Sequence, residues 1–448
     1  MKLRSLVRGL LPALAVLLAP LLFSCGGGGG AAEPQLSTMG MLGQPSLTMI
    51  AGNLIFVSAS LNGMDEDPGR FGMLVDSGSP VVLIDPSLFG GTPPGTTAEI
   101  PTTINLGLLD ASGQPVVIVD DAPALQVSTA MMDALGLGGV LGGQVMRQFS
   151  VQLDYAAPMM EGFCLGCTAG PRDDVQSPGG VVPFTLRGGG NSSVSLGMTA
   201  QGMAIESPKV NIPPTRIPVT VAIDGANHLC IVDTGATEVS LRSTVYASLV
   251  SDGRAQLTGG IAIMTIAGAS NASVTRAKTI TLGGETIDDP PVLTIMSTPP
   301  DQLLGGITSE IGAQVDCLLG GSFLRNFLVT IDYPAGQLHL QPYNVPPIPD
   351  EFRRVGFTIG LDATGMNFVV ESVYPNTDAA AKMVMMNDQV VAVDGTSLTS
   401  VGQVSAADAL LDGMPGTSKA ITFGAQTGDP SLAGQTVSIM VDDLIPNP

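Results

Sequence analysis

The stretch Val140–Tyr155 (VLGGQVMRQFSVQLDY) is repeated later in the chain as Leu318–Tyr333 (LLGGSFLRNFLVTIDY). The two stretches share Leu, Gly, Gly, Arg, Phe, Val, Asp and Tyr at the same relative positions. Agreement of this kind at a constant offset rarely arises by chance and indicates an internal duplication. The middle of the chain is therefore predicted to contain two copies of one structural unit.

A second shared element precedes each copy. Residues 71–79 read FGMLVDSGS and residues 228–236 read HLCIVDTGA, so in both cases an apolar run leads directly into Asp-Ser/Thr-Gly. The spacing from this element to the following Leu-Gly-Gly differs by about one hairpin, so the loops between the two elements are predicted to have diverged. The residues of interest are Asp76, Ser77 and Gly78 in the first unit, and Asp233, Thr234 and Gly235 in the second.

The residues around these elements have the composition of short strands and turns. The chain has 57 Gly and 34 Pro but only 4% aromatic residues, which favours β structure over helical bundles. Asn62-Gly63 and Asp224-Gly225 are typical of hairpin turns, and short helices are expected within 142–148 and 320–326. Strands are predicted near Asn53–Leu61, Pro115–Val119, Ile217–Ile223, Ala262–Ile266 and Val292–Ile295.

These patterns resemble the aspartic peptidases of the pepsin and retropepsin group, over roughly residues 45–345. The shared motifs are an apolar pair followed by Asp-Thr/Ser-Gly, and an apolar pair followed by Gly, once in each half. The resemblance implies a mainly β, two-lobed acid protease fold. It places lobe 1 at residues 45–165, a connection at 166–179 and lobe 2 at 180–345.

The resemblance also implies a chemistry in which Asp76 and Asp233 meet across a pseudo-twofold axis. Two carboxylates about 3 Å apart cannot both ionise, so they share one proton and activate one water for attack on a peptide bond. Ser77, Gly78, Thr234 and Gly235 would support the pair through tight turns and hydroxyl bonds between lobes. This chemistry needs no metal or cofactor, and the expected partner is a peptide or protein substrate.

Three features depart from the pattern of active peptidases. Pro80 follows the first Asp turn, Ala236 provides no hydroxyl after the second, and lobe 1 has no tyrosine between Asp76 and its Leu-Gly-Gly. Retention of both Asp turns favours an aspartic endopeptidase. The alternative is a catalytically inactive, peptide-binding envelope lipoprotein with the same fold. A Ser-His-Asp triad fits less well, because the chain has only 2 His and no GxSxG elbow.

The cysteines fit an oxidising compartment. Cys164 and Cys167 form a CxxC motif without a second such motif, so a small disulfide loop is favoured over a zinc site. The resemblance places the strands of Cys230 and Cys317 side by side. This leaves two alternatives for that pair, a disulfide or inert thiols in the core.

The C-terminal segment, residues 351–446, follows a proline-rich linker at 346–349. It resembles the PDZ domains of bacterial envelope proteases in its order of strand, capped short helix and strand ending in Asp394-Gly395. The resemblance makes Val355, Gly356, Phe357 and Thr358 a loop that binds the C-terminal carboxylate of a peptide. The domain would bind peptide or regulate access to the cleft, and simple packing against the lobes is the alternative.

The N-terminus is typical of a bacterial lipoprotein signal peptide. Basic residues precede an apolar run that is too short to span a membrane comfortably, and residues 22–25 (LFSC) resemble a lipobox. Residues 1–24 are predicted to be removed, Cys25 to be lipidated and residues 25–44 to form a glycine-rich tether. The alternative is ordinary cleavage without lipidation. The expected location is the outer side of a bacterial membrane, in the periplasm or on the cell surface.

The net charge of −21 makes nucleic acid an unfavourable partner, because an acidic surface repels phosphates. For the same reason, attachment to a membrane is expected through the lipid anchor alone.

Overall fold

The computed structural model describes residues 35–38, 42–46, 48–51, 53–61, 71–89, 100–110, 112–127, 132, 136–157, 162–192, 195–198, 204–206, 210–265, 268–296, 301–345, 350–362, 364–401 and 404–445. The predicted signal peptide, the lipidation site Cys25 and the turn at Asn62-Gly63 lie outside these residues. The protein is mainly β, as predicted. No helix within the described part of the chain is both long enough and apolar enough to cross a membrane.

The first repeat forms one large sheet with the strand order β1-β8-β6-β9-β5-β4-β3, and β7 pairs with β4 and β8. Its apolar residues alternate into a continuous core, which explains why the Val- and Leu-rich runs fold as strands. The elements are β1 Gln35–Thr38, β3 Thr48–Ala51, β4 Leu54–Leu61, β5 Phe71–Val75, β6 Val82–Ile84, the 3-10 helix η1 Pro86–Phe89, β7 Ile100–Leu109, β8 Pro115–Gln126, β9 Gly139–Leu141 and α2 Gly143–Met146.

The second repeat forms a sheet with the order β20-β21-β24-β19-β25-β18-β17-β22-β23. Asp224-Gly225 makes the predicted two-residue turn between β17 and β18, with positive φ at both residues. The elements are β17 Pro218–Ile223, β18 Ala226–Val232, β19 Val239–Leu241, α3 Ser243–Ser251, β20 Gln256–Thr265, β21 Gly268–Arg276, β22 Thr279–Leu282, β23 Glu285–Asp288, β24 Pro291–Ile295, α4 Gln302–Ile311, β25 Cys317–Leu319 and α5 Gly321–Leu324.

The two repeats have the same topology around their aspartates. In the first, β5 pairs in parallel with β9 and β9 pairs antiparallel with β6; in the second, β18, β25 and β19 have the same relationship. The hairpin β22–β23 lies between the two shared elements of the second repeat and accounts for part of its greater spacing. The duplication seen in the sequence is therefore a duplication of structure.

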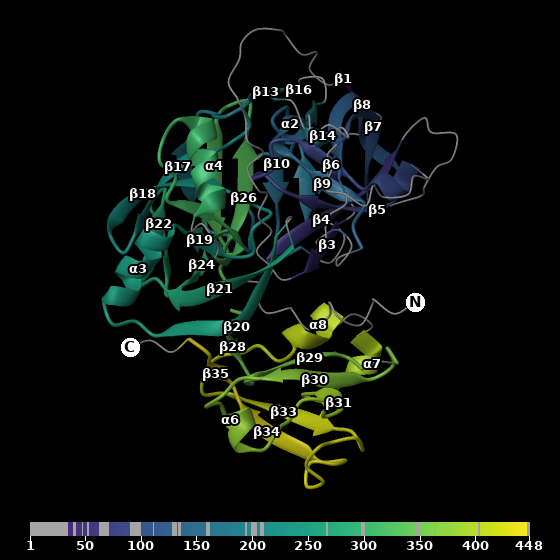
Figure 1. Cartoon of the computed structure of the whole chain (residues 1–448), viewed down its shortest axis with the longest axis vertical. Coiled ribbons are helices and arrows are strands. Elements are labelled where there is room, and N and C mark those ends of the chain that lie inside the picture. Colours follow the sequence, from purple (N-terminus) through teal and green to yellow (C-terminus); the bar gives the residue numbers. More distant parts are fainter. Residues whose placement is uncertain are drawn as a thin grey trace.

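A third sheet joins the repeats, with the order β12-β27-β26-β10-β11-β2. Its centre is the antiparallel pair of β10 and β26, which come from the two copies of the repeated stretch (Figure 1). The register pairs Val151 with Ile331, Gln152 with Thr330 and Leu153 with Val329, so each repeat presents equivalent positions to the other. A pseudo-twofold axis therefore passes between Gln152 and Thr330. The strands are β2 Pro45–Ser46, β10 Ser150–Leu153, β11 Phe163–Leu165, β12 Gly180–Pro183, β26 Phe327–Asp332 and β27 Gln337–Pro342.

Four short strands make two small hairpin-like pairs in the segment that leads into the second repeat. These strands are β13 Gly190–Ser192, which pairs with β16 Val210–Ile212, and β14 Ser195–Met198, which pairs with β15 Ala204–Glu206.

The C-terminal domain has its own hydrophobic core and lies below both repeats in Figure 1. Its short helix α6 begins after Thr377, whose hydroxyl accepts a hydrogen bond from the Ala380 N–H, as expected of a capping threonine. Its elements are β28 Arg353–Arg354, β29 Phe357–Leu361, β30 Phe368–Val373, α6 Asp378–Ala381, β31 Val390–Val393, β32 Thr396–Ser397, α7 Leu398–Val401, α8 Val404–Ala409, β33 Ser418–Phe423, β34 Thr436–Met440 and β35 Asp442–Asp443.

The C-terminal domain is fixed to the second repeat by apolar and charged contacts. Phe352 and Ile445 are fully buried in a cluster formed mainly by the second repeat. The guanidinium of Arg276, at the end of β21, forms ion pairs with Asp350 and Asp443. The Arg276 guanidinium is surrounded by acidic and apolar groups at this junction, and these contacts hold the C-terminal domain against the second repeat.

One segment differs from the expected boundaries. Residues 35–38, which the sequence assigned to the tether of residues 25–44, form β1 and pair with residues 117–120 of β8. Without β1, residues 117–120 of β8 would lie at an edge of the sheet, and a short segment can pair with such backbone groups without an apolar pattern of its own.

Candidate active site

The strands β5 and β18 deliver Asp76 and Asp233 to equivalent places. The backbone N–H of each aspartate donates to the carbonyl of the apolar residue before the Gly-Gly pair, Leu141 or Leu319, at 3.1 Å in both repeats. Because these parallel strands are buried and apolar, their ends are rigid positions from which a polar side chain can project. The predicted catalytic aspartates therefore lie at matching strand ends.

Gly78 and Gly235 lie under the carboxyl group of the opposite repeat. A Cβ atom added to Gly78 would be 2.4 Å from Cγ of Asp233, and one added to Gly235 would be 2.4 Å from Cγ of Asp76. Any side chain at either position would displace the carboxyl group. The two glycines are therefore required for the close approach of the two turns.

Ser77 and Thr234 lock the two turns together by reciprocal hydrogen bonds. The Ser77 N–H donates to Thr234 Oγ1 at 2.9 Å, and the Thr234 N–H donates to Ser77 Oγ at 3.1 Å. Each hydroxyl then donates across the axis, from Ser77 to the Val232 carbonyl and from Thr234 to the Val75 carbonyl. The structure thus brings together all six residues that the sequence singled out around the aspartates.

Each carboxyl group lies against the glycine of the opposite turn, so the side chains of Asp76 and Asp233 approach each other between the repeats and each affects the pKa of the other. Asp76 Oδ1 accepts from the Ser79 N–H at 3.0 Å, and Asp233 Oδ1 accepts from the Gly235 N–H at 3.0 Å. Asp76 Oδ2 is buried and accepts no hydrogen bond from an N–H or hydroxyl of the described residues. The two residues are only 1% and 4% exposed, so water screens their interaction poorly.

The buried environment of Asp76 and Asp233 favours the protonated form of their carboxyl groups. Burial raises the pKa of Asp76 to about 6, against the opposing effects of the hydrogen bond with Asp233 and the positive charge of Arg216. Burial also raises the pKa of Asp233 well above its usual value, and the negative charge of Asp76 raises it further. The pair therefore holds one proton over a range of pH in which an exposed aspartate is ionised.

Arg216 is a charged neighbour of this pair that the sequence did not reveal. It is 2% exposed and precedes β17, at the position equivalent to Leu54, the first residue of β4 in the first repeat. Its guanidinium bonds the carboxylate of Glu310 on α4, with Nη2 and Nε at 3.0 and 3.1 Å from Oε2. A buried cation and its counter-ion thus stand near the pair in the second repeat, where the first repeat has a leucine.

The cysteines are paired in the structure. Cys164 and Cys167 form one disulfide and Cys230 and Cys317 form another. The second links neighbouring residues of the parallel strands β18 and β25, and both cysteines are fully buried. It therefore links β18, the strand that leads to Asp233, covalently to β25.

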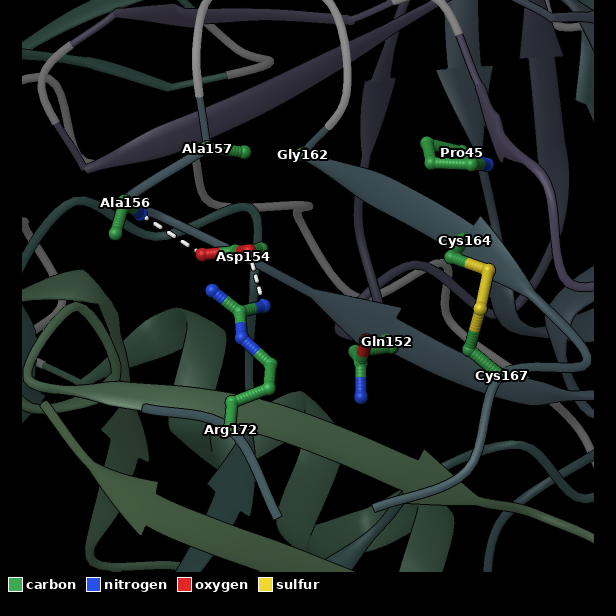
Figure 2. Close-up of a pocket in the computed structure, with 9 residues that line it drawn as sticks. All are labelled: Pro45, Gln152, Asp154, Ala156, Ala157, Gly162, Cys164, Cys167 and Arg172. Atoms are coloured by element: carbon green, nitrogen blue, oxygen red, sulfur yellow. Dashed lines mark hydrogen bonds and ion pairs between the residues drawn. A yellow bond between two sulfur atoms is a disulfide. The ribbon is translucent and has the colours of Figure 1, made fainter. Parts of the chain in front are cut away.

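A pocket of about 320 Å³ lies on the third sheet, the one that joins the two repeats, beside the Cys164–Cys167 disulfide. Figure 2 shows Arg172 and Asp154 facing each other on one side and the disulfide on the other. The Asp154 carboxylate also accepts hydrogen bonds from the Tyr343 hydroxyl and the Ala156 N–H, so its charge is already neutralised by the chain. The pocket is lined by Pro45, Gln152, Asp154, Ala156, Ala157, Gly162, Cys164, Cys167 and Arg172, and the two aspartates of the candidate site are not among them.

The predicted carboxylate-binding loop of the C-terminal domain is buried, at Val355, Gly356, Phe357 and Thr358. Immediately after it, the Ile359 N–H donates to Asp408 Oδ1 of α8 at 3.0 Å. The other Asp408 oxygen accepts from Arg354 at 2.7 Å. A carboxylate of the chain itself thus bonds the backbone next to this loop.

One comparison with known proteins matches part of the chain. Residues 219–323 match the model of a family described as aspartyl protease. The matched segment contains the Asp233 turn and the Leu-Gly-Gly of the second repeat. None of the curated proteins compared is similar to the chain. The geometry and the match agree on the second repeat, and we conclude that the chain contains an aspartyl protease-like domain.

Proposed function

We propose that the protein is an aspartic endopeptidase in which Asp76 and Asp233 act as a catalytic pair. The observation that carries the proposal is that each buried carboxyl group lies against the glycine of the opposite turn, Asp233 at Gly78 and Asp76 at Gly235, while Ser77 and Thr234 bond the two turns together. The family match over residues 219–323 supports a protease-like activity in general.

The pair would work as one acid and one base. The ionised carboxylate accepts a proton from a water molecule as the water attacks the peptide carbonyl, and the protonated carboxyl donates a hydrogen bond to the developing oxyanion. The proton taken from the water then goes to the departing amine. Because the carboxyls titrate as a unit, neither Asp76 nor Asp233 is assigned a fixed role.

The matching topology of the two repeats supports a pepsin- or retropepsin-like arrangement of two lobes. Equivalent strand pairs lead to the aspartates, and β10 pairs with β26 across the pseudo-twofold axis. A substrate in an extended conformation would bind between the lobes, where both carboxyls can reach one peptide bond.

A second candidate is a catalytically inactive protein that binds peptides. It is favoured by the burial of the aspartates, which are 1% and 4% exposed, because a substrate must reach them before any reaction occurs. The two candidates differ in one measurable result, since an inactive protein binds a peptide and releases it intact.

The test is incubation of the full chain with a mixed peptide library from acidic to neutral pH, followed by mass spectrometry. The proposal expects new peptide termini with the parent and none with Asp76→Asn or Asp233→Asn, because each change removes one half of the acid–base pair. Intact peptides at every pH, together with measurable peptide binding, would favour the inactive candidate.

For the C-terminal domain we propose a PDZ-like fold, supported by the order of its strands and its Thr377-capped helix. The bond of the Ile359 N–H to Asp408 favours a packing role over peptide binding. Titration with a peptide in its carboxylate and amide forms tests this: preferential binding of the carboxylate form would show that the loop is accessible.

We also propose that Cys25 is lipidated and anchors the protein to the outer side of a bacterial membrane. The proposal rests on the sequence of residues 1–25. Mass spectrometry of the mature N-terminus tests it, since a Cys25→Ser variant should lack the acyl groups and leave the membrane fraction.

A further inference from the structure

A buried polar cluster connects the turn after Asp233 with the first residues of the C-terminal domain. Asn53 Nδ2 donates to the Thr237 carbonyl at 2.8 Å, to Glu238 at 3.3 Å and to Glu351 at 3.3 Å. Arg325 donates to Asn53 Oδ1 at 2.7 Å and forms an ion pair with Glu351. Residues from the first repeat, the second repeat and the segment before the C-terminal domain thus share one site.

The first repeat shows that this cluster is not required by the topology. The position equivalent to Glu238, five residues after the aspartate, is Val81, and the position equivalent to Asn53 is Thr215. The backbone packs alike in both places, because a Cβ on Gly142 would meet the Val81 carbonyl and one on Gly320 would meet the Glu238 carbonyl. A valine therefore suffices for the turn itself, and the carboxyl of Glu238 has a different role.

Glu238 and Glu351 form a second pair of interacting carboxyls. Glu238 is 0% exposed, and its Oε2 has no hydrogen-bond partner among the described residues. Burial and then the charge of Glu351 raise the pKa of Glu238, so Glu238 is the neutral member. Burial alone would raise the pKa of Glu351, but the charge of Arg325 lowers it to about 2, so Glu351 is the ionised member.

The charges around this pair come from several elements. Arg325 is the cation that acts on both carboxyls, and Asp350 adds negative charge near Glu238. The charge of Glu351 also raises the pKa of Asp412 in the C-terminal domain, and the charge of Arg325 lowers it. The charge of Arg325 lowers the pKa of Tyr155 as well. With these acids close by, one arginine can balance one ionised glutamate but not two.

We propose that Glu351 is a positioning residue of the active site: it holds Arg325, Asn53 and Glu238 together and so fixes the turn that follows Asp233. The segment that begins the C-terminal domain is then part of the catalytic unit. This inference rests on the proposed peptidase function, and its test includes a measurement that does not depend on hydrolysis.

The test compares variants of the full chain. Glu351→Ala should lower kcat on the order of tenfold to a hundredfold, with a smaller change in KM, because a small displacement of a reacting group is costly. Glu351→Gln keeps an acceptor oxygen for Arg325 and offers an N–H to Glu238, which can then ionise opposite Arg325, and should restore most of the rate. The matched control is Arg353→Ala, which removes ion pairs to Asp289, Asp350 and Asp443 at the same junction but no contact to Glu351. It should keep the parental kcat.

Hydrogen exchange of the amides at residues 234–238 gives the independent measurement. Exchange should be faster in Glu351→Ala than in the parent, in Glu351→Gln and in Arg353→Ala. If Glu351→Ala does not fold, Glu351→Asp replaces it, since the shorter side chain keeps the charge but loses the reach; it should show a smaller change in the same direction.

Two results would overturn the inference: parental kcat and exchange in the alanine or aspartate variant, or an equal loss in Arg353→Ala, which would mean that domain docking alone matters. A parent that cleaves no peptide would instead overturn the proposed function. In that case the exchange data alone decide the role of Glu351.

Discussion

Ser77 and Thr234 exchange hydrogen bonds across the pseudo-twofold axis, with N···O distances of 2.9 and 3.1 Å. Each hydroxyl also donates to a backbone carbonyl of the opposite repeat, so four bonds cross between the turns. The residues lie 157 positions apart in the chain. Their bonds set the separation of the carboxyls of Asp76 and Asp233.

Removing the Thr234 hydroxyl should therefore weaken both stability and activity. Thr234→Ala leaves the Ser77 N–H buried without its acceptor, which should lower the free energy of unfolding by about 1–3 kcal/mol and reduce kcat. Thr234→Ser keeps the hydroxyl and serves as the control. Denaturant unfolding and peptide hydrolysis measure the two effects, and equal behaviour of the alanine and serine variants would contradict the bracing role.

The pH dependence of activity should reflect the raised pKa values of the pair. As pH rises through about 6, the value to which burial raises the pKa of Asp76, the pair loses one of its two protons, and the raised pKa of Asp233 keeps the other proton on the pair. Hydrolysis should therefore peak near neutral pH and fall on both sides. A rate profile from pH 3 to 9 checks this, and an optimum near pH 3 would contradict it.

The same pair should make stability depend on pH. Both pKa values are higher in the folded state than in the unfolded chain, so the contribution of the pair is full below about pH 4, and the share of Asp76 is lost as pH rises through about 6. The double variant Asp76→Asn/Asp233→Asn removes this loss. It should be more stable than the parent at pH 7 by about 1–3 kcal/mol. Denaturant unfolding at pH 4 and pH 7 compares the two proteins, and parallel curves would count against the account.

The ion pair of Arg216 and Glu310 should stabilise the second repeat and hold down the pKa values of the aspartates. Arg216→Leu leaves Glu310 as an uncompensated buried charge, which should cost about 3–5 kcal/mol. The double variant Arg216→Leu/Glu310→Leu should recover most of that stability, because Leu54 already occupies the equivalent place in the first repeat. In the double variant the pH–rate profile should move to higher pH, since the cation no longer favours ionised Asp76 and Asp233. An unmoved profile would show that Arg216 is structural alone.

The disulfide between Cys230 and Cys317 closes a long loop, with a sequence separation of 87. Replacing both residues by alanine should lower the free energy of unfolding by about 2–5 kcal/mol. The matched control is Cys164→Ala/Cys167→Ala, whose loop has a separation of 3 and should matter less. Denaturant unfolding of both variants under oxidising conditions provides the comparison, and a larger loss from the short loop would be the opposite result.

The sequence predicted the parts of the fold that repeat. The copies at 140–155 and 318–333 predicted the matching strands, and the two Asp-Ser/Thr-Gly runs predicted which residues meet. Both predictions succeed because a motif and its copy have similar local sequences and form the same local structure. The mainly β class followed from short Val- and Ile-rich runs between turn residues.

The sequence did not predict the residues whose partners are distant and not repeated. Arg216 and Glu310 lie 94 positions apart, and Asn53 and Glu351 lie 298 apart, with no local pattern to connect them. Glu351 follows a proline-rich stretch, and such a stretch indicates a domain boundary, not a contact with the repeats. The one available signal was a departure inside the duplication, where Glu238 and Arg216 replace the apolar Val81 and Leu54.

Asp76 and Asp233 are proposed to act as a single catalytic unit, and a double-mutant cycle on kcat/KM measures whether they do. Groups that act as a unit show non-additive losses. Asp76→Asn and Asp233→Asn should each abolish nearly all hydrolysis, and the double variant should lose no more than either single one. Parental hydrolysis by either single variant, or losses that multiply in the double variant, would contradict the claim.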